Sequence, residues 1–354
     1  LSCCGRGRRA RRPARTDRML SLTDVTVRTV RTDRVDIPLG ALTCFTGVSG
    51  SGKSTLLMDG VARAVRAGLD GTSAPGVGTV AWTGPLHWVT VVDQEPIGRT
   101  PRSSPATYTK AFNLIRNLFA GTDAAARRGL TAASFSFNSP GGRCEPCTGY
   151  GVRQVDMNFL PDVWVTCDVC DGRRYGPEVL AVTYQGLAID EVLDLTVDEA
   201  AELLDTPALR PVLTALRQTG LGYLRLGQSA TVLSGGEAQR LKLAAALTKG
   251  ARQPGLVVLD EPVTGLHPAD VQVLVDAFDL LIAAGNTVVL AEHDLHLAAA
   301  ADWLIDMGPG SGAAGGSVLH CGPPDTLRPD SGPTARYLRG LLPGPDTSPS
   351  VDTV

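Results

Sequence analysis

The sequence of 354 residues lacks any long hydrophobic run, because no stretch of 18 consecutive apolar residues occurs in it. A helix that crosses a membrane needs about 20 such residues, so no membrane span is predicted. The N-terminus carries charge but no apolar segment, and it therefore does not match a secretory signal. We accordingly expect a cytoplasmic protein in a reducing compartment, where paired cysteines favour metal binding over disulfides.

Lysine is scarce, and neither sign of charge is in large excess. Four lysines stand against 29 arginines, which we interpret as a compositional bias of the source genome. The formal net charge of −3 gives by itself no indication of a nucleic-acid partner. The distribution is uneven, however: residues 1–18 carry seven arginines and one aspartate, and residues 97–177 carry ten basic and six acidic residues. Any DNA-binding surface must therefore be local, and the basic excess points to 97–177.

From Met19 onward, strand-like and helix-like segments alternate, which predicts an α/β fold. Buried strands are expected at 41–46, 88–92, 255–259, 287–291 and 302–307, and helices at 54–67 and 268–284. We divide the chain into an unstructured leader at 1–18, the first part of a core at 19–96, an insert at 97–177, a helical region at 178–233, the second part of the core at 234–342 and an unstructured tail at 343–354. A basic arm that tracks phosphates is the alternative for the leader.

Residues 47–54 read GVSGSGKS and fit the phosphate-binding pattern G-x-x-x-x-G-K-[ST]. The glycines let backbone N–H groups curl around a phosphate, and the following helix adds its positive dipole end. The pattern predicts that Lys53 reaches the β- and γ-phosphates of ATP and that Ser54 ligates Mg²⁺. An apolar run before the motif and a helical stretch after it argue against a chance glycine loop. The residues expected to hold nucleotide here are Gly47, Ser49, Gly50, Ser51, Gly52, Lys53, Ser54 and Thr55.

The segment LVVLDE at 256–261 is an apolar strand that ends in two carboxylates. Asp260 is predicted to hold Mg²⁺, directly or through water, and Glu261 to accept a proton from the attacking water. Two acids at a strand end can alternatively cap a helix, but the phosphate loop upstream favours the catalytic interpretation.

The segment LSGGEAQR at 233–240 places a serine and two glycines at the mouth of a helix, which makes a second backbone cradle for phosphate. One nucleotide needs only one phosphate loop. A second cradle therefore implies a sandwich, with ATP held between the loop of one module and this motif of another. The residues expected to contribute are Ser234, Gly235, Gly236 and Glu237.

Two C-x-x-C pairs lie 19 residues apart: Cys144 with Cys147, and Cys167 with Cys170. This spacing is typical of a zinc site, and four thiolates suit a closed, tetrahedral, structural centre. Such a centre leaves no position for a reactive water, so catalysis by zinc is not expected. Two disulfides are the alternative, and they require an oxidising compartment.

The phosphate loop, Gln94, SGGE, LVVLDEP and His293 occur in the order found in ATP-binding cassette (ABC) ATPases, which the chain resembles. The resemblance implies an α/β, ABC-type P-loop ATPase with an inserted helical signature region and a small zinc-bound β-hairpin module. It also implies that Gln94 senses Mg²⁺ and the attacking water, that residues 263–267 cross to a partner module and that His293 contacts the γ-phosphate. The implied catalytic residues are thus Glu261, Gln94 and His293.

Longer segments resemble one family, UvrA, the damage-sensing ATPase of bacterial nucleotide excision repair. The matching text includes CFTGVSGSGKSTL, PIGRTPRSSPATYT, FSFNSPGGRCEPC, LGQSATVLSGGEAQRLKLA and LDEPVTGLHPADVQ. The resemblance covers about 20–342 and is to the C-terminal half of a two-module protein. It implies an ATP hydrolase that is not itself a nuclease, with ATP, Mg²⁺ and Zn²⁺ as cofactors and damaged duplex DNA as a partner.

The resemblance to one half of the family's protein also leaves questions of partnership open. The partner module could be a second copy of this chain or a separately encoded first half. Nothing in the sequence resembles the docking domain for UvrB, so contact with UvrB stays open. A UvrA-like drug self-resistance protein, a non-repair regulator and a truncated half without repair activity are the alternatives.

The basic insert supplies the candidate DNA contacts. Its arginines could bind phosphates in a sequence-neutral way, next to aromatic residues near the zinc hairpin. The alternative is that these arginines bond carbonyls and carboxylates inside the zinc module. The candidates are Arg99, Arg102, Arg143, Arg153, Arg173 and Arg174, with Tyr150 and Phe159.

Overall fold

The computed structural model describes residues 9, 11–98, 100–157 and 160–342. The chain folds into two compact units. The first, called the core unit here, comprises the described residues up to Asp93 and those from Lys249 onward; the second, the insert unit, is Gln94–Thr248. The signature sequence that begins at Ser234 therefore groups with the insert, whereas the sequence had assigned it to the second part of the core.

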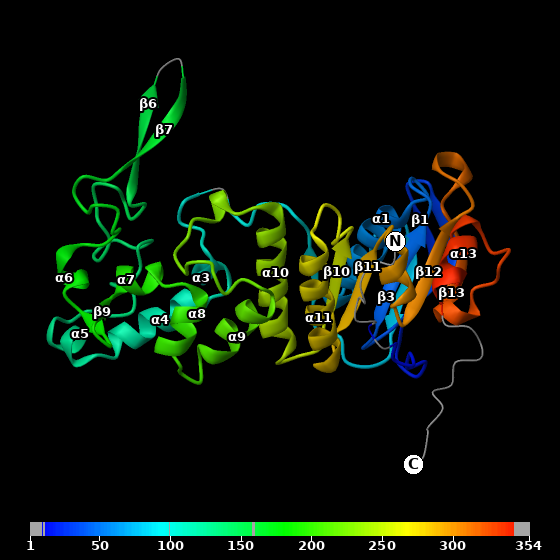
Figure 1. Cartoon of the computed structure of the whole chain (residues 1–354), viewed down its shortest axis with the longest axis horizontal. Helices are drawn as coiled ribbons and strands as arrows, with labels where there is room; N and C mark the ends of the chain where they lie inside the picture. The colour runs from blue at the N-terminus through cyan, green and yellow to red at the C-terminus, as the bar shows by residue number, and fades with distance from the viewer. Residues whose placement is uncertain (1–8, 10, 99, 158–159, 343–354) are drawn as a thin grey trace, which may run out of the picture. The chain divides into compact units, whose positions relative to one another are not determined.

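The core unit is built on a six-stranded sheet with the strand order β13–β12–β3–β11–β10–β5 (Figure 1). All neighbours pair in parallel except β13, which is antiparallel to β12. The five predicted strands lie within one residue of the observed ones, which confirms the α/β expectation. The strand bounds are β3 Leu42–Gly47, β5 Val89–Val92, β10 Leu256–Asp260, β11 Thr287–Ala291, β12 Trp303–Gly308 and β13 Ser317–Gly322.

The central strands are nearly continuous apolar runs, as expected for parallel strands covered on both faces. β10 reads LVVLD and β11 reads TVVLA, and only Asp260 among these ten residues is not fully buried. Because parallel strands present their carboxyl ends at one edge, the segments that follow β3, β10 and β11 are brought together there. Those segments are the phosphate loop, the acidic pair at 260–261 and the segment beginning at Glu292.

A second sheet in the core unit is antiparallel, with the order β2–β1–β4: Val30–Pro38, Met19–Val27 and Val77–Trp82. A continuous helical stretch follows the phosphate loop and packs with both sheets around Leu20, Phe45, Leu56, Val258 and Ile305. It consists of α1 Lys53–Thr55, the π-helical η1 Leu56–Ala62 and α2 Arg63–Leu69. The other helices of the core unit are α11 Pro268–Ala283, α12 Leu295–Ala299, α13 Pro333–Leu338 and the 3₁₀ turns η3 Gly312–Ala314, η4 Pro324–Thr326 and η5 Arg339–Leu341.

The insert unit is mostly helical and has its own apolar core, in which the rings of Phe112 and Phe137 stack at 4.6 Å. A hairpin of β6 Val152–Met157 and β7 Leu160–Thr166 projects from the helices of this unit (Figure 1), and Cys167 directly follows its second strand. The helices are α3 Pro105–Tyr108, α4 Ala111–Ala120, α5 Asp123–Arg127, α6 Pro177–Leu180, α7 Ile189–Asp194, α8 Val197–Leu203, α9 Arg210–Gln218, η2 Ala230–Val232 and α10 Gly235–Gly250, with a small pair β8 Thr183–Tyr184 and β9 Leu187–Ala188. The last residues of α10, from Lys249, belong to the core unit.

Part of the predicted leader is anchored. The Arg9 guanidinium donates 2.9 Å hydrogen bonds to both carboxylate oxygens of Asp302 and one of 2.8 Å to Asp279. The Asp302 side chain is fully buried, so it needs a partner of opposite charge. The expectation of an unstructured leader is therefore wrong for Arg9, while residues 1–8 and 10, like the tail at 343–354, lie outside the described residues. In the described part of the chain, no helix is long and apolar enough to cross a membrane.

Candidate nucleotide site and metal centre

The phosphate loop lies between β3 and α1, and its first residue packs tightly against β12. Its first residue, Gly47, has φ +135° and sits beside Met307 of β12, its partner in the parallel register. A Cβ at Gly47 would overlap the Met307 carbonyl oxygen, so only glycine fits at this position. The loop therefore begins at a point where β12 leaves no room for a side chain on β3.

Lys53 is 5% exposed and lies inside the curl of the loop. Its Nζ donates to the carbonyl oxygens of Gly47 and Val48, each at 3.1 Å. Burial lowers the pKa of Lys53, while the nearby carboxylates of Glu261 and Asp260 act in the opposite direction. The ammonium is thus positioned by loop carbonyls and faces two acids.

Ser54 and Asp260 meet at the carboxyl edge of the sheet, where Ser54 Oγ donates to Asp260 Oδ1 at 2.8 Å. Burial raises the pKa of Asp260, and the Ser54 hydrogen bond opposes that rise. Neighbouring oxygens around Mg²⁺, each about 2.1 Å from the ion, lie about 2.9 Å apart. The two oxygens therefore fit a shared magnesium ion.

Glu261 and His293 are brought together from the ends of β10 and β11. His293 Nε2 lies 3.4 Å from Glu261 Oε1, and both side chains are 43% exposed. Glu261 adopts φ +46°, an unusual backbone conformation for a glutamate, while its N–H donates to Ala291 O at 2.9 Å. This turn sends the carboxylate out of the strand and toward solvent, where a water could reach it.

Glu292, which was not among the predicted site residues, connects the segment after β10 with the segment after β11. It is 2% exposed and accepts hydrogen bonds from the N–H groups of Val263 at 3.0 Å and His293 at 2.8 Å. Burial raises the pKa of Glu292, and those backbone donors oppose the rise. The only feature of the sequence that points to Glu292 is its position directly before His293.

The signature residues open α10 in the insert unit. Glu237 Oε2 accepts from the N–H and Oγ of Ser234, at 2.8 and 3.0 Å, and Glu237 Oε1 accepts from Tyr223 Oη at 2.6 Å. This reciprocal cap fixes the glycines at the helix N-terminus. Tyr223 was missed by the sequence analysis because it lies 14 residues from its partner.

Gln94 also belongs to the insert unit, where its Cβ would lie 3.3 Å from a Cβ built on Gly235. Gln94 therefore packs against the signature helix of its own chain. Its predicted role toward Mg²⁺ in the core unit stays a prediction.

The four paired cysteines converge in one buried cluster. All four sulfurs lie within 4.8 Å of one another, with Cys144–Cys167 at 4.0 Å and Cys147–Cys170 at 3.7 Å. A zinc ion with four sulfurs at about 2.3 Å would place them about 3.8 Å apart, so the cluster fits zinc. Each described cysteine is a free thiol, which does not support the alternative of disulfides.

The five described arginine candidates in the insert are all engaged within the unit. Arg102 stacks 4.0 Å from the ring centroid of Tyr150 and donates to the Thr148 carbonyl. The other four donate to Glu145, Asp168, Asp190 and the Gly227 carbonyl, in the pairs Arg143–Glu145, Arg153–Asp168, Arg173–Asp190 and Arg174–Gly227. The contacts of Arg102, Arg143 and Arg153 match the alternative of bonds inside the zinc module, whereas Arg173 and Arg174 reach residues outside 97–177. Arg99 and Phe159 lie outside the described residues.

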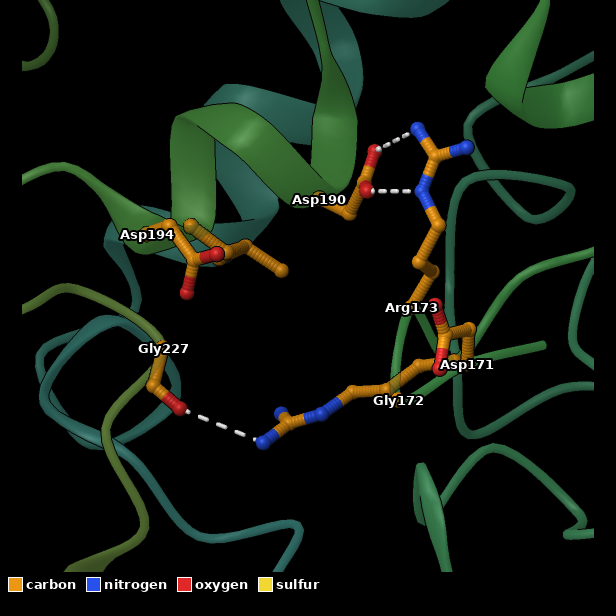
Figure 2. A pocket seen from close by; sticks show the side chains of 8 residues that line it. Asp171, Gly172, Arg173, Asp190, Asp194 and Gly227 are labelled. Atoms are coloured by element: carbon orange, nitrogen blue, oxygen red, sulfur yellow. Dashed lines mark hydrogen bonds and ion pairs between the residues drawn. The ribbon is translucent and has the colours of Figure 1, made fainter. Parts of the chain in front are cut away.

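A cavity of about 300 Å³ lies beside the zinc module and is lined by charged groups. Figure 2 shows the Arg173–Asp190 ion pair on one side of the cavity and the Asp194 carboxylate across from it. Arg174, which also lines the cavity, donates to the Gly227 carbonyl at 3.3 Å. Burial lowers the pKa of Arg174. The arginines here link the zinc module to the segment that leads to the signature.

The fold and the site together are those of an ABC-type P-loop domain: a phosphate loop after β3, an acidic strand end at β10 and a histidine after β11. No protein-family model matches the chain. It is 52% identical over 314 residues to UvrABC system protein A of Aquifex aeolicus, covering 87% of this chain and 34% of that protein. It is 49% identical over 317 residues to the Escherichia coli (strain K12) protein of the same name, covering 86% and 33%.

Among solved structures, UvrA2 from Deinococcus radiodurans matches with a TM-score of 0.82 and 46% identity, over 96% of this chain and 41% of that one. The chain is therefore homologous to UvrA, which confirms the resemblance drawn from its motifs. It spans about a third of the length of the curated relatives it matches.

Proposed function

We propose that the chain is a UvrA-like ABC module that binds and hydrolyses ATP and binds DNA in nucleotide excision repair. The observation that carries the proposal is the convergence of Lys53, Ser54, Asp260, Glu261 and His293 at one edge of the core sheet. A loop cation, two oxygen ligands, a general base and an imidazole are the groups that phosphoryl transfer to water needs. Homology to UvrA over most of the chain supports the same function.

In this proposal, the phosphate loop binds the β- and γ-phosphates through its backbone N–H groups. The Lys53 ammonium gives up its hydrogen bonds to the Gly47 and Val48 carbonyls and donates to the phosphates instead. Mg²⁺, when bound by Ser54 and Asp260, supplies charge neutralisation for the phosphates. Glu261 accepts the proton of the water that attacks the γ-phosphorus in line. His293, 3.4 Å from Glu261, orients this base and contacts the γ-phosphate.

The second phosphate cradle requires a second module. Ser234, Gly235 and Gly236 form the cradle at the N-terminus of α10, with Glu237 as its cap. A head-to-tail arrangement would pair this cradle in one chain with Lys53 in the other. A symmetric homodimer creates two equivalent sites, and a separately encoded first half would create related ones.

The DNA-binding part of the proposal rests on the zinc hairpin. Three consecutive residues of β7 are large, apolar and about half exposed: Val163 (47%), Trp164 (46%) and Val165 (49%). The ring centroids of Trp164 and Tyr150 are 5.9 Å apart, and the Arg102 guanidinium stacks on the Tyr150 ring. An exposed aromatic beside cationic groups suits stacking on the bases of deformed DNA. The ion pair of Arg153 with Asp168 is exposed and therefore weak enough to exchange for a DNA phosphate.

The zinc part of the proposal is structural. Zn²⁺ held by the four cysteines would fix the base of the hairpin, because both C-x-x-C turns adjoin its strands. Without the ion, four buried thiols would have to hold the same geometry through weak hydrogen bonds alone.

The experiment that tests this function measures ATP hydrolysis by the purified chain without DNA, with intact duplex and with duplex that carries a bulky adduct. We expect Mg²⁺-dependent turnover that adduct-bearing duplex changes more than intact duplex does. Lys53→Ala should abolish turnover under all three conditions. Turnover that persists in Lys53→Ala, or that no DNA affects, would contradict the proposal.

A further inference from the structure

The turn between β12 and β13, residues 309–316, runs alongside the phosphate loop in the core unit. Gly312 N–H donates to Gly50 O at 3.0 Å, and Gly316 N–H donates to Ser51 O at 3.0 Å. A Cβ built on Gly50 would also lie 3.1 Å from Ser311 Cβ, so the two segments are in contact along their length.

Gly316, at the end of the turn, is hydrogen-bonded both to the phosphate loop and to β2. While its N–H binds Ser51 O, its carbonyl accepts from Arg31 N at 2.9 Å, in the strand that follows the β1–β2 turn. Its φ is +87°, and a Cβ there would overlap the carbonyl oxygen of Thr29. Only glycine can therefore connect the phosphate loop, the β1–β2 hairpin and the turn at this point.

The strand that leads into the turn, β12, is tied to the start of the phosphate loop. Thr46 Oγ1 donates to Asp306 Oδ1 at 2.9 Å, and both residues are buried. Thr46 directly precedes Gly47, and Asp306 directly precedes Met307, whose carbonyl packs on Gly47. The loop is thus held at its entrance and at two of its peptide groups by one neighbouring segment.

These bonds determine which way the loop peptides face. In a trans peptide, the carbonyl of one residue and the N–H of the next point in opposite directions. Holding Gly50 O orients the Ser51 N–H, which closes the loop's own turn on Val48 O at 3.2 Å. Holding Ser51 O directs the Gly52 N–H away from Gly316 and leaves it available to the nucleotide proposed above.

We propose that the segment from Asp306 to Gly316 is a positioning element for nucleotide, one that keeps the phosphate loop curled before ATP arrives. The inference rests on the nucleotide binding proposed above. A loop that is already curled does not have to be ordered by the ligand, so affinity is gained without a new contact to the ligand. The segment positions the loop and is not itself catalytic.

The test is calorimetric titration of Mg²⁺-ADP into Gly316→Ala. We expect the dissociation constant to rise about ten- to hundredfold, since displaced phosphate-binding groups lose affinity steeply. The matched control is Gly285→Ala in the turn before β11, because Gly285 has the same φ of +87° but a Cβ there meets no atom closer than 3.7 Å. Gly285→Ala carries the same backbone strain and should bind Mg²⁺-ADP within about twofold of the wild-type chain.

A second pair of variants covers the case in which Gly316→Ala does not fold. Thr46→Val removes the hydrogen bond to Asp306 and should weaken Mg²⁺-ADP binding, while Thr46→Ser should restore it. If the wild-type chain binds no Mg²⁺-ADP, the proposed function itself fails. If the wild-type chain binds, Lys53→Ala does not, and both Gly316→Ala and Thr46→Val bind like the wild type, the positioning role is overturned.

Discussion

Ser54 Oγ donates a 2.8 Å hydrogen bond to Asp260 Oδ1, which joins the helix after the phosphate loop to the end of β10 across 206 residues of sequence. Both oxygens are at the separation that two ligands of one magnesium ion adopt. The pair therefore connects the start of the helix after the phosphate loop with the acidic end of β10.

Asp260→Asn should weaken nucleotide binding only when magnesium is present. An amide is a poorer ligand for Mg²⁺ than a carboxylate, so the dissociation constant for Mg²⁺-ADP should rise about tenfold or more. The affinity for ADP in EDTA should not change. The exposed Asp330→Asn is a control with the same change of charge. An equal loss in EDTA would show that Asp260 acts on the fold of the loop and not on the metal.

Glu261→Gln should separate binding from hydrolysis. The glutamine keeps the size of the side chain but cannot accept the proton of the attacking water, so turnover should fall about 10²- to 10⁴-fold. Binding of ATP should remain, because Lys53 and the loop are untouched. Steady-state hydrolysis and ATP titration measure the two quantities, with Glu178→Gln, an exposed residue of α6, as the control. A Glu261→Gln chain with wild-type turnover would remove Glu261 from the base role.

ATP should drive association of the Glu261→Gln variant if, as proposed, the cradle at Ser234 of one chain completes the nucleotide site at Lys53 of another. Sedimentation at micromolar protein should show a dimer with ATP and less association without it. The double variant Lys53→Ala/Glu261→Gln should not respond to ATP. A chain that stays strictly monomeric with bound ATP would contradict the homodimer and leave a separately encoded half as the partner.

The motifs that depend on local sequence were predictable. The phosphate loop, the LVVLDE strand and the signature helix each carry their own context within about a dozen residues, and the structure has the expected elements at those places. Zinc spacing is local as well, and the four cysteines meet as predicted.

Contacts between distant segments were not predictable. Thr46 and Asp306 are 260 residues apart, and Arg9 pairs with Asp302 across 293, so no pattern in one sequence connects them. The same reason explains the arginines of the insert: their acidic and carbonyl partners, such as Asp190 for Arg173, are chosen by the fold. The basic composition of the insert indicated a positively charged surface. It could not show that these arginines already have acidic or carbonyl partners in the same unit.

The zinc cluster predicts a metal-dependent hairpin. The chain should bind one zinc ion, and Cys147→Ser should lose it along with part of the thermal stability of the insert unit, because structural zinc contributes about 10–16 kcal/mol of apparent binding energy. Metal analysis and thermal unfolding measure the two effects. Cys321→Ser, which lies in β13 of the core unit, should keep the zinc. Retention of stoichiometric zinc by Cys147→Ser would contradict the four-cysteine site.

Trp164 should contribute to DNA binding through stacking and not through charge. Trp164→Ala removes an exposed ring, and a base–aromatic stack is worth about 1–3 kcal/mol, so affinity for adduct-bearing duplex should fall about tenfold. Because no cation is removed, the slope of affinity against salt should stay the same, whereas Arg153→Ala should make the slope shallower. Tyr337→Ala removes an aromatic side chain that is 70% exposed on α13 of the core unit and should leave affinity unchanged. If Trp164→Ala binds DNA as tightly as the wild-type chain, the exposed strand of the hairpin does not face the duplex, and the DNA surface has to be sought on another part of the insert unit.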